Sequence, residues 1–224
     1  MINSESAARY YVASLCDVAA MERLDQLVAL IVAENEQQNL IAKPTIASVW
    51  QRHIADSAQL LSHVPRETSD PGAWLDLGTG AGFPGLVIAA LRPEWQVWLV
   101  ESRKRRVEWL ERARIALDLP KCKVVGARLE MVDSFAAGVV SARAFAPLER
   151  LIDLSARFST DSTLWLLPKG RSAAHELQAL PESQRRLFHV EQSITDPEAG
   201  IITGRLEQGS RADSHNFREA RQKT

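Results

Sequence analysis

A short apolar run that ends in a glycine-rich turn is the feature that most limits what this chain can fold into. Residues 73–77 read Ala-Trp-Leu-Asp-Leu, and residues 78–85 continue as Gly-Thr-Gly-Ala-Gly-Phe-Pro-Gly before an apolar run that ends at Leu91. This order is typical of a buried parallel strand that turns tightly into a helix. Glycines permit the turn, and the first amides of the helix face a ligand above it. The segment therefore predicts a strand–turn–helix unit with a ligand site at the strand end.

The chain beyond this turn alternates between short apolar segments and helical ones. Further helices are expected over residues 84–91, 103–117 and 147–157, with a brief one near Leu129. Further strands are expected at 96–100, 122–125, 138–141 and 163–167, followed by a hairpin from 187–194 and 200–206. Strands that alternate with helices of about a dozen residues favour a doubly wound parallel sheet. We therefore predict an α/β fold with a mostly parallel sheet and a terminal antiparallel hairpin.

The first seventy residues have a different pattern. Leu24, Leu27, Val28 and Ile31 recur at the spacing of one buried helical stripe. Five basic and nine acidic residues give this segment a net charge of −4, and the polar stretch 65–72 closes it. We expect an N-terminal helical cap over residues 1–70, a ligand-binding core over 71–207, and a polar, flexible tail over 208–224.

Composition excludes several classes of protein. The two cysteines, Cys16 and Cys122, have no partner at metal-ligand spacing, so neither a disulfide scaffold nor a zinc site is expected. The longest apolar run, 86–91, is far shorter than the roughly 20 residues that span a bilayer. The first residues show no cationic segment before an apolar one, and no dimerisation stripe is visible. These patterns predict a cytoplasmic monomer without metal.

Three interpretations fit the glycine-rich turn: a purely structural connection, a dinucleotide site and an S-adenosylmethionine site. A dinucleotide fingerprint reads Gly-x-Gly-x-x-Gly, but the third glycine comes one position early, at Gly82, and Phe83 stands in its place. Asp76, within the preceding strand, would repel a pyrophosphate but suits the ammonium and sulfonium charges of S-adenosylmethionine. Glu101 ends the second strand, where its carboxylate can accept both ribose hydroxyls. Dinucleotide sites carry an acid at the position of Glu101 too, so Asp76 and the early Gly82 are what favour S-adenosylmethionine. The candidate cofactor contacts here are Asp76, Gly80 and Glu101.

Two segments further along extend the candidate site, each with a plainer alternative. After the third strand, Leu129 could pack on an adenine ring and Glu130 could bind its amino group, or both could begin a surface helix. Arg143 ends the fourth strand, at the edge of the sheet where ligands bind. Its guanidinium suits a phosphate or the O6/N7 edge of guanine, but it could also be a rim arginine in an ion pair.

Basic residues gather between positions 101 and 130, where nine Lys and Arg face five acidic residues. A solvated helix face with ion pairs four residues apart explains part of this run. Four successive cations beside the candidate site also suit an RNA backbone. The candidate RNA contacts are Arg103, Lys104, Arg105, Arg106 and Lys169.

The ordered set of motifs resembles the bacterial RsmG (GidB) family, which methylates a guanine N7 of 16S ribosomal RNA. The matching segments are residues 35–40, 52–57, 76–85, 101–106, 127–130, 142–146 and 169–170. The resemblance implies a Rossmann-like class I methyltransferase in which S-adenosylmethionine is the cofactor. It places Glu101 near the ribose and the following residues around the cofactor: Gly78, Phe83, Leu129, Glu130 and Arg143. Glu34 and Glu101 depart from the common Trp and Asp of relatives.

The implied chemistry needs few catalytic groups. Guanine N7 has an in-plane lone pair and no proton, so direct in-line methyl transfer needs no obligatory general base. Positioning alone can lower such a barrier by roughly 7–11 kcal/mol. Arg143 is the candidate that holds the guanine or its phosphate. His53 and Asp56 could form a catalytic dyad, but fixing the cap over the pocket is the simpler role for them.

Other functions remain open on the residues alone. The alternative is an S-adenosylmethionine-dependent methyltransferase acting on a small molecule or protein, since the cofactor turn says nothing about the acceptor. A dinucleotide-dependent oxidoreductase is disfavoured by Asp76 and Gly82. A non-catalytic RNA-binding module would leave the cofactor turn without a use.

Overall fold

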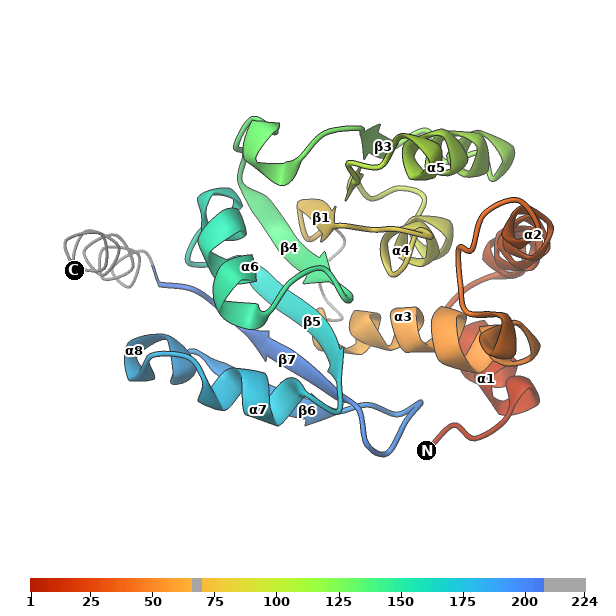
Figure 1. The fold of residues 1–224 in the computed structure, drawn as a ribbon. Helices are drawn as coiled ribbons and strands as arrows, with labels where there is room; N and C mark the ends of the chain where they lie inside the picture. Colours follow the sequence, from red (N-terminus) through yellow and green to blue (C-terminus); the bar gives the residue numbers. More distant parts are fainter. Residues whose placement is uncertain (66–69, 208–224) are drawn as a thin grey trace.

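The computed structural model describes residues 1–65 and 70–207, so the tail predicted at 208–224 lies outside the described residues. A seven-stranded sheet runs through the molecule in the order β3-β2-β1-β4-β5-β7-β6 (Figure 1). Strands β1 to β5 are parallel, and β7 and β6 add to β5 as an antiparallel hairpin. The strands are β1 (Ala73–Leu77), β2 (Val97–Val100), β3 (Cys122–Val125), β4 (Ala137–Ala142), β5 (Leu164–Gly170), β6 (Phe188–Gln192) and β7 (Gly200–Gly204). The expected doubly wound sheet with a terminal hairpin is confirmed.

Helices cover both faces of this sheet, and the side chains of β1 alternate between the two layers. Trp74 joins the layer formed with α4 and α5, whereas Leu75 and Leu77 join the layer formed with α6 and α7. This alternation is the period of two that a strand imposes on its side chains. The helices of the core are α4 (Gly85–Leu91), α5 (Lys104–Ala116), η4 (Leu129–Met131), α6 (Leu148–Ser155), η5 (Ala156–Phe158), α7 (Ala173–Gln178) and α8 (Glu182–Arg185).

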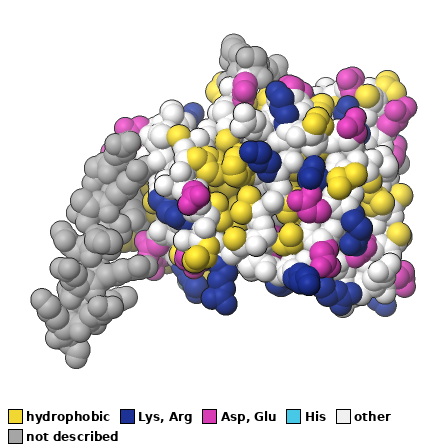
Figure 2. Space-filling model, turned by 90° about the horizontal axis from the view of Figure 1, so that it is seen from above, with side chains coloured by type: hydrophobic (Ala, Val, Ile, Leu, Met, Phe, Trp, Pro, Cys, Tyr) yellow, Lys and Arg dark blue, Asp and Glu magenta, His cyan; other side chains and the backbone are white. Residues whose placement is uncertain are grey.

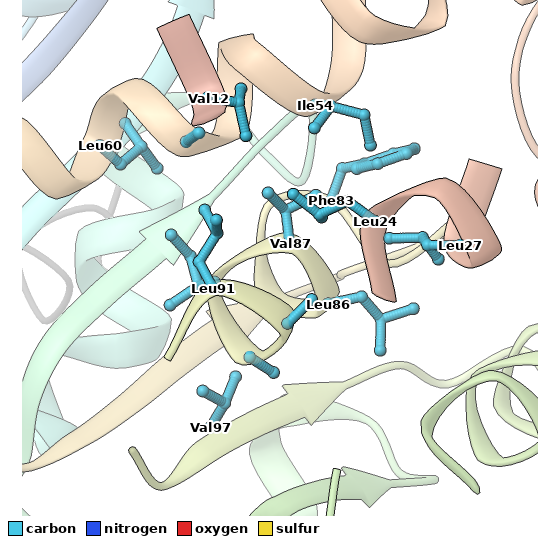
Figure 3. Close-up of a cluster of buried hydrophobic side chains, with 14 of the residues drawn as sticks. Val12, Leu24, Leu27, Ile54, Leu60, Phe83, Leu86, Val87, Leu91 and Val97 are labelled. Atoms are coloured by element: carbon cyan, nitrogen blue, oxygen red, sulfur yellow. The ribbon is translucent and has the colours of Figure 1, made fainter. Parts of the chain in front are cut away.

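The N-terminal segment is helical, as expected, and packs on the α4 side of the sheet (Figure 1). Figure 3 shows Leu24 and Leu27 of α2 and Ile54 of η2 facing Leu86 of α4 and Phe83, which precedes that helix. Leu24, Leu27, Ile54 and Leu86 are fully buried, so the cap shares one apolar layer with the core. Its elements are α1 (Glu5–Ala13), α2 (Val18–Asn35), η1 (Lys43–Ser48), η2 (Trp50–Ala55), α3 (Asp56–Ala58) and η3 (Gln59–His63).

The η2 segment is a π-helical turn that carries His53 and leads into α3, which begins at Asp56. Such turns occur often at functional sites, and this one lies beside the carboxyl ends of the strands. Over residues 1–65 and 70–207, no helix is both long and apolar enough to cross a bilayer. The same residues contain no group of three His, Cys, Asp or Glu side chains that could hold a metal.

Candidate functional site

The glycine-rich turn lies at the carboxyl end of β1 and leads into α4. Gly78, Gly80 and Gly82 have φ angles of +62°, +58° and +105°, a backbone region that residues with a side chain rarely adopt. A Cβ atom on Gly78 would also come within 2.2 Å of the Phe145 ring. Left-handed backbone and close approach together explain why the turn requires glycine at position 78.

Asp76 holds this turn from below. One carboxylate oxygen accepts a 2.8 Å hydrogen bond from the Ser141 hydroxyl, and the other accepts a 3.0 Å bond from the Gly85 amide. The indole N–H of Trp74 donates to the Ser141 oxygen, so Trp74, Ser141 and Asp76 are linked by consecutive hydrogen bonds. Burial raises the pKa of the fully buried Asp76 to about 6, although its hydrogen bonds oppose the shift. Asp76 therefore ties β1, β4 and α4 together beneath the turn.

A cavity of about 450 Å³ opens above the turn, at the ends of β1, β2 and β3. Its volume falls in the range of small-molecule sites. Five of the residues predicted from the sequence line it: the candidate cofactor residues Gly78, Glu101, Leu129 and Glu130, and the candidate RNA contact Arg103.

Glu101 is the polar anchor of this cavity and is only 3% exposed. One carboxylate oxygen accepts bonds from the Ser102 and Arg103 amides, at 2.8 and 2.9 Å, and the other accepts from the Gly80 amide at 3.2 Å. Arg103 Nε also lies 3.4 Å from the first oxygen, so a free acceptor position for a ligand hydroxyl is left on the second oxygen, to which the Gly80 amide donates. Leu129 offers a buried apolar surface and Glu130 an exposed carboxylate. This set of groups fits an adenosine, with its ribose at Glu101 and its base at Leu129.

Phe83 and Arg143 form a second cluster beside this cavity rather than part of its wall. The Phe83 ring is 2% exposed and stacks on His53 with ring centres 5.0 Å apart. The Arg143 guanidinium lies 4.9 Å from the centre of the Phe83 ring. Its Nη2 is 3.1 Å from His53 Nδ1, and its Nη1 is 3.4 Å from an Asp56 oxygen. The second cluster therefore joins the end of β4 to the cap.

Two further cavities meet at Arg143. A small one of about 190 Å³ lies between the cap and the 193–201 turn, and a groove of about 850 Å³ lies between the β4–α6 connection and α7. The groove shares residues 144–147 with the cavity above the glycine turn. Arg143 itself lines both the small cavity and the groove.

The residues of the predicted basic run differ in how firmly they are held. The Arg103 and Lys104 side chains are 72% and 90% exposed, and they make long ion pairs with Glu101 at 3.4 Å and with Glu108 at 3.9 Å. Arg105 donates a 2.9 Å bond to the Gln37 carbonyl and Arg106 donates to the Asn39 carbonyl, so both fix α5 to the segment of the cap that follows α2. Figure 2 shows Lys and Arg side chains spaced among acidic and apolar ones over this face. Arg103 and Lys104 are therefore held by long surface ion pairs, whereas Arg105 and Arg106 are bonded to the cap.

Lys169 is also committed to the fold. Its side chain is 5% exposed, and its ammonium pairs with Glu176 at 2.8 Å and donates to the Ala146 carbonyl at 2.6 Å. This contact joins the end of β5 to α7 and to the β4–α6 connection. Lys169 therefore shapes the groove from within instead of extending an outer basic surface.

His53 and Asp56 share Arg143 as a partner, and their other hydrogen bonds go to different residues. His53 bonds to Arg143 and to the Thr45 hydroxyl, whereas an Asp56 oxygen accepts from Thr195 at 2.7 Å and from Gln59 at 2.9 Å. Thr195 lies 139 residues beyond Asp56, on the connection between β6 and β7. No local pattern in the sequence marks Thr195, because its link to the cap exists only in the folded chain.

Comparison with known proteins agrees with this geometry. The family model described as GidB, rRNA small subunit methyltransferase G, matches residues 20–200. Ribosomal RNA small subunit methyltransferase G of Erythrobacter litoralis is 62% identical over 92% of this chain and 98% of its own length. The protein of the same name from Novosphingobium aromaticivorans is 60% identical over 91% of this chain and 88% of its own length.

Solved structures show the same fold at low sequence identity. A methyltransferase from Geobacter sulfurreducens superposes with a TM-score of 0.53 at 15% identity, covering 81% of this chain and 88% of its own. An S-adenosylmethionine-dependent methyltransferase from Aquifex aeolicus gives 0.52 at 12% identity, covering 71% and 93%. Through the family model and its close relatives, this chain belongs to the GidB family and is a methyltransferase of small-subunit ribosomal RNA.

Proposed function

We propose that this protein transfers the methyl group of S-adenosylmethionine to N7 of a specific guanine in 16S ribosomal RNA. Family membership carries the proposal, and the cavity above the glycine turn supports it. When bound, S-adenosylmethionine supplies a methyl group on a cationic sulfur, which an unprotonated ring nitrogen can attack.

The donor site is assigned to the residues around the 450 Å³ cavity. Glu101 accepts the ribose hydroxyls, Leu129 packs on the adenine, and Glu130 reaches its amino group. Gly78 and Gly80 let the remaining part of the cofactor lie against bare backbone. Asp76 and Phe83 support the turn from beneath, since both are buried.

Arg143 is assigned to the acceptor rather than to the donor, because it lines the groove and the small cavity but not the donor cavity. Its guanidinium can donate hydrogen bonds to a phosphate or to the O6 edge of guanine. Guanine N7 has no proton to lose, so no residue has to act as a base. Catalysis then depends on how well Arg143 and the groove align N7 with the methyl group.

Contact with the RNA backbone is assigned to Arg103 and Lys104. These two cations are highly exposed and make long ion pairs with Glu101 and Glu108, whereas Arg105 and Arg106 bond to carbonyls of the cap and Lys169 is buried against Glu176. We expect the protein to act as a cytoplasmic monomer on 16S RNA, either free or within the small ribosomal subunit or its precursor.

The test is transfer of labelled methyl from S-adenosylmethionine to 16S RNA and to small subunits, both taken from cells that lack the gene. Cleavage at 7-methylguanine then maps the label. One labelled guanine is the expected result. Cofactor binding without transfer to either substrate would overturn the ribosomal acceptor and favour a small molecule or a protein.

A further inference from the structure

The contact between Arg143 and His53 determines where the imidazole proton lies. Arg143 has only N–H donors, so His53 Nδ1, 3.1 Å away, must accept the hydrogen bond. A neutral imidazole that accepts at Nδ1 carries its proton at Nε2. That proton points to the Thr45 hydroxyl, 3.0 Å from Nε2. Nδ1 of His53 is therefore a hydrogen-bond acceptor, and Nε2 is a hydrogen-bond donor.

The surroundings of His53 keep it in this neutral form. Burial, followed by the charges of Arg143 and Arg52, lowers the pKa of His53 to about 3. The nearby carboxylate of Asp56 bonds to Arg143, Thr195 and Gln59 instead of the imidazole. Phe83 covers one face of the ring. The acceptor at Nδ1 thus persists throughout the physiological pH range.

Arg143 is held from two directions by the cap. Its Nη2 bonds to His53 and its Nη1 to Asp56, while its guanidinium lies over the Phe83 ring. Figure 3 shows that Ile54, the neighbour of His53, packs against Phe83, so this part of the cap is fixed to the core. The guanidinium of an exposed arginine samples many rotamers, and these contacts remove that freedom.

We infer that His53 is a positioning residue for methyl transfer. Its Nδ1 accepts a hydrogen bond from Arg143 and so directs the Arg143 guanidinium toward the acceptor groove. The inference rests on the proposed role of Arg143 toward the RNA. It gives the helical cap a part in the reaction. It also removes His53 from the role of general base, because the lone pair that would take a proton is already occupied.

Two substitutions separate the hydrogen-bond acceptor from the aromatic ring. His53→Asn places an amide oxygen near the position of Nδ1 but removes the ring, whereas His53→Phe keeps the ring stacked on Phe83 and removes the acceptor. His189→Asn, on the exposed side of β6, is the matched control. Each variant is assayed for kcat and KM with 16S RNA, for S-adenosylmethionine affinity and for its melting temperature.

We expect His53→Phe to lower kcat/KM for RNA by about 10- to 100-fold, the effect of one hydrogen bond to a charged group. His53→Asn is expected to recover most of that loss, with cofactor affinity unchanged in both variants. Equal activity in the two variants, or better activity in His53→Phe, would overturn the inference. A loss of activity that merely parallels a fall in the melting temperature would also overturn the inference.

Two readouts on the wild-type protein complete the test. With ¹⁵N-labelled histidine, NMR is expected to show the neutral Nε2–H form of His53 from about pH 5 to about pH 9, and kcat is expected to show no acid limb from it. A titration of His53 in that range would overturn the inference. The NMR result does not depend on the substrate, so a failure of 16S methylation in the wild type would be recognised separately as a failure of the proposed function.

Discussion

The carboxylate of Asp76 and the amide of Gly85 are joined by a 3.0 Å hydrogen bond that fixes the first turn of α4 to β1. Because Asp76 is fully buried, its pKa is raised from 3.8 to about 6. Between these two pH values the native protein holds a proton that the unfolded chain has released. The contribution of Asp76 to the free energy of unfolding must therefore fall as pH rises through this window, by about 3 kcal/mol in all.

Asp76→Asn should remove this pH dependence. The amide oxygen can still accept from Gly85, and the amide nitrogen can donate to the Ser141 oxygen, so the fold should persist. Urea unfolding from about pH 4 to about pH 7 is expected to show the variant gaining stability relative to the wild type, by up to about 3 kcal/mol. If the free energies of unfolding of the variant and the wild type changed in parallel over this pH range, the raised pKa of Asp76 would be contradicted.

Gly78→Ala tests the close approach at the glycine turn. The added Cβ would meet the Phe145 ring at 2.2 Å and would also force a left-handed backbone on alanine. Gly72→Ala is the matched control, because Gly72 has a φ of +82° but its Cβ would meet only atoms 3.7 Å away. Both variants should lose about 1 kcal/mol of stability from backbone strain.

Only Gly78→Ala should weaken S-adenosylmethionine binding, by about tenfold or more, since a shift of about 1 Å at a ligand turn is costly. Isothermal titration calorimetry measures the dissociation constant for both variants. Equal affinities would mean that the turn does not touch the cofactor.

The sequence alone predicts the sheet and the donor cavity well, for a local reason. Each parallel strand and the turn after it are adjacent in the chain, so Gly78, Glu101 and Leu129 could be placed at one edge of the sheet by strand order alone. The structure brings these three to a single cavity. The sequence pattern does not predict the short helices α7 and α8, because their six and four residues are too few to show the period of a helix.

Sequence patterns do not predict contacts between segments that are far apart in the chain. The run from Arg103 to Arg106 looks uniform in sequence, yet Arg105 and Arg106 bond to carbonyls of the cap that are 68 and 67 residues away, respectively. Lys169 looks like an outer cation but is buried against Glu176. Such pairings depend on how the cap docks on the core, and no residue type or spacing encodes that docking locally.

The division of the basic run gives a prediction about RNA binding. Replacing both Arg103 and Lys104 with alanine should make the dependence of log Kd on log salt less steep by about 1.5, as expected for the loss of two phosphate contacts. Arg185 and Arg186, at the end of α8, provide the control pair, since α8 lies at the opposite end of the molecule from α5 (Figure 1). Filter binding of 16S RNA over a salt series measures both slopes. Equal reductions in the two double variants would contradict a specific contact.

Arg143→Ala should separate methyl transfer from cofactor binding. Asp56 keeps its hydrogen bonds to Thr195 and Gln59 when Arg143 is removed, so its carboxylate is not left without partners and the protein should remain folded. Because Arg143 lies outside the donor cavity, the affinity for S-adenosylmethionine should be unchanged. Turnover with 16S RNA should fall by about 10- to 100-fold, through loss of a charged hydrogen bond to the acceptor.

Arg143→Lys sharpens this prediction, because lysine keeps the charge but cannot bond to His53, Asp56 and a ligand with one planar group. We expect an activity between those of Arg143→Ala and the wild type. Single-turnover methyl transfer and calorimetric titration of the cofactor, measured on the same preparations, decide the matter. Full turnover in Arg143→Ala would remove Arg143 from the acceptor site, and weakened cofactor binding with normal turnover at saturating cofactor would instead place it in the donor site.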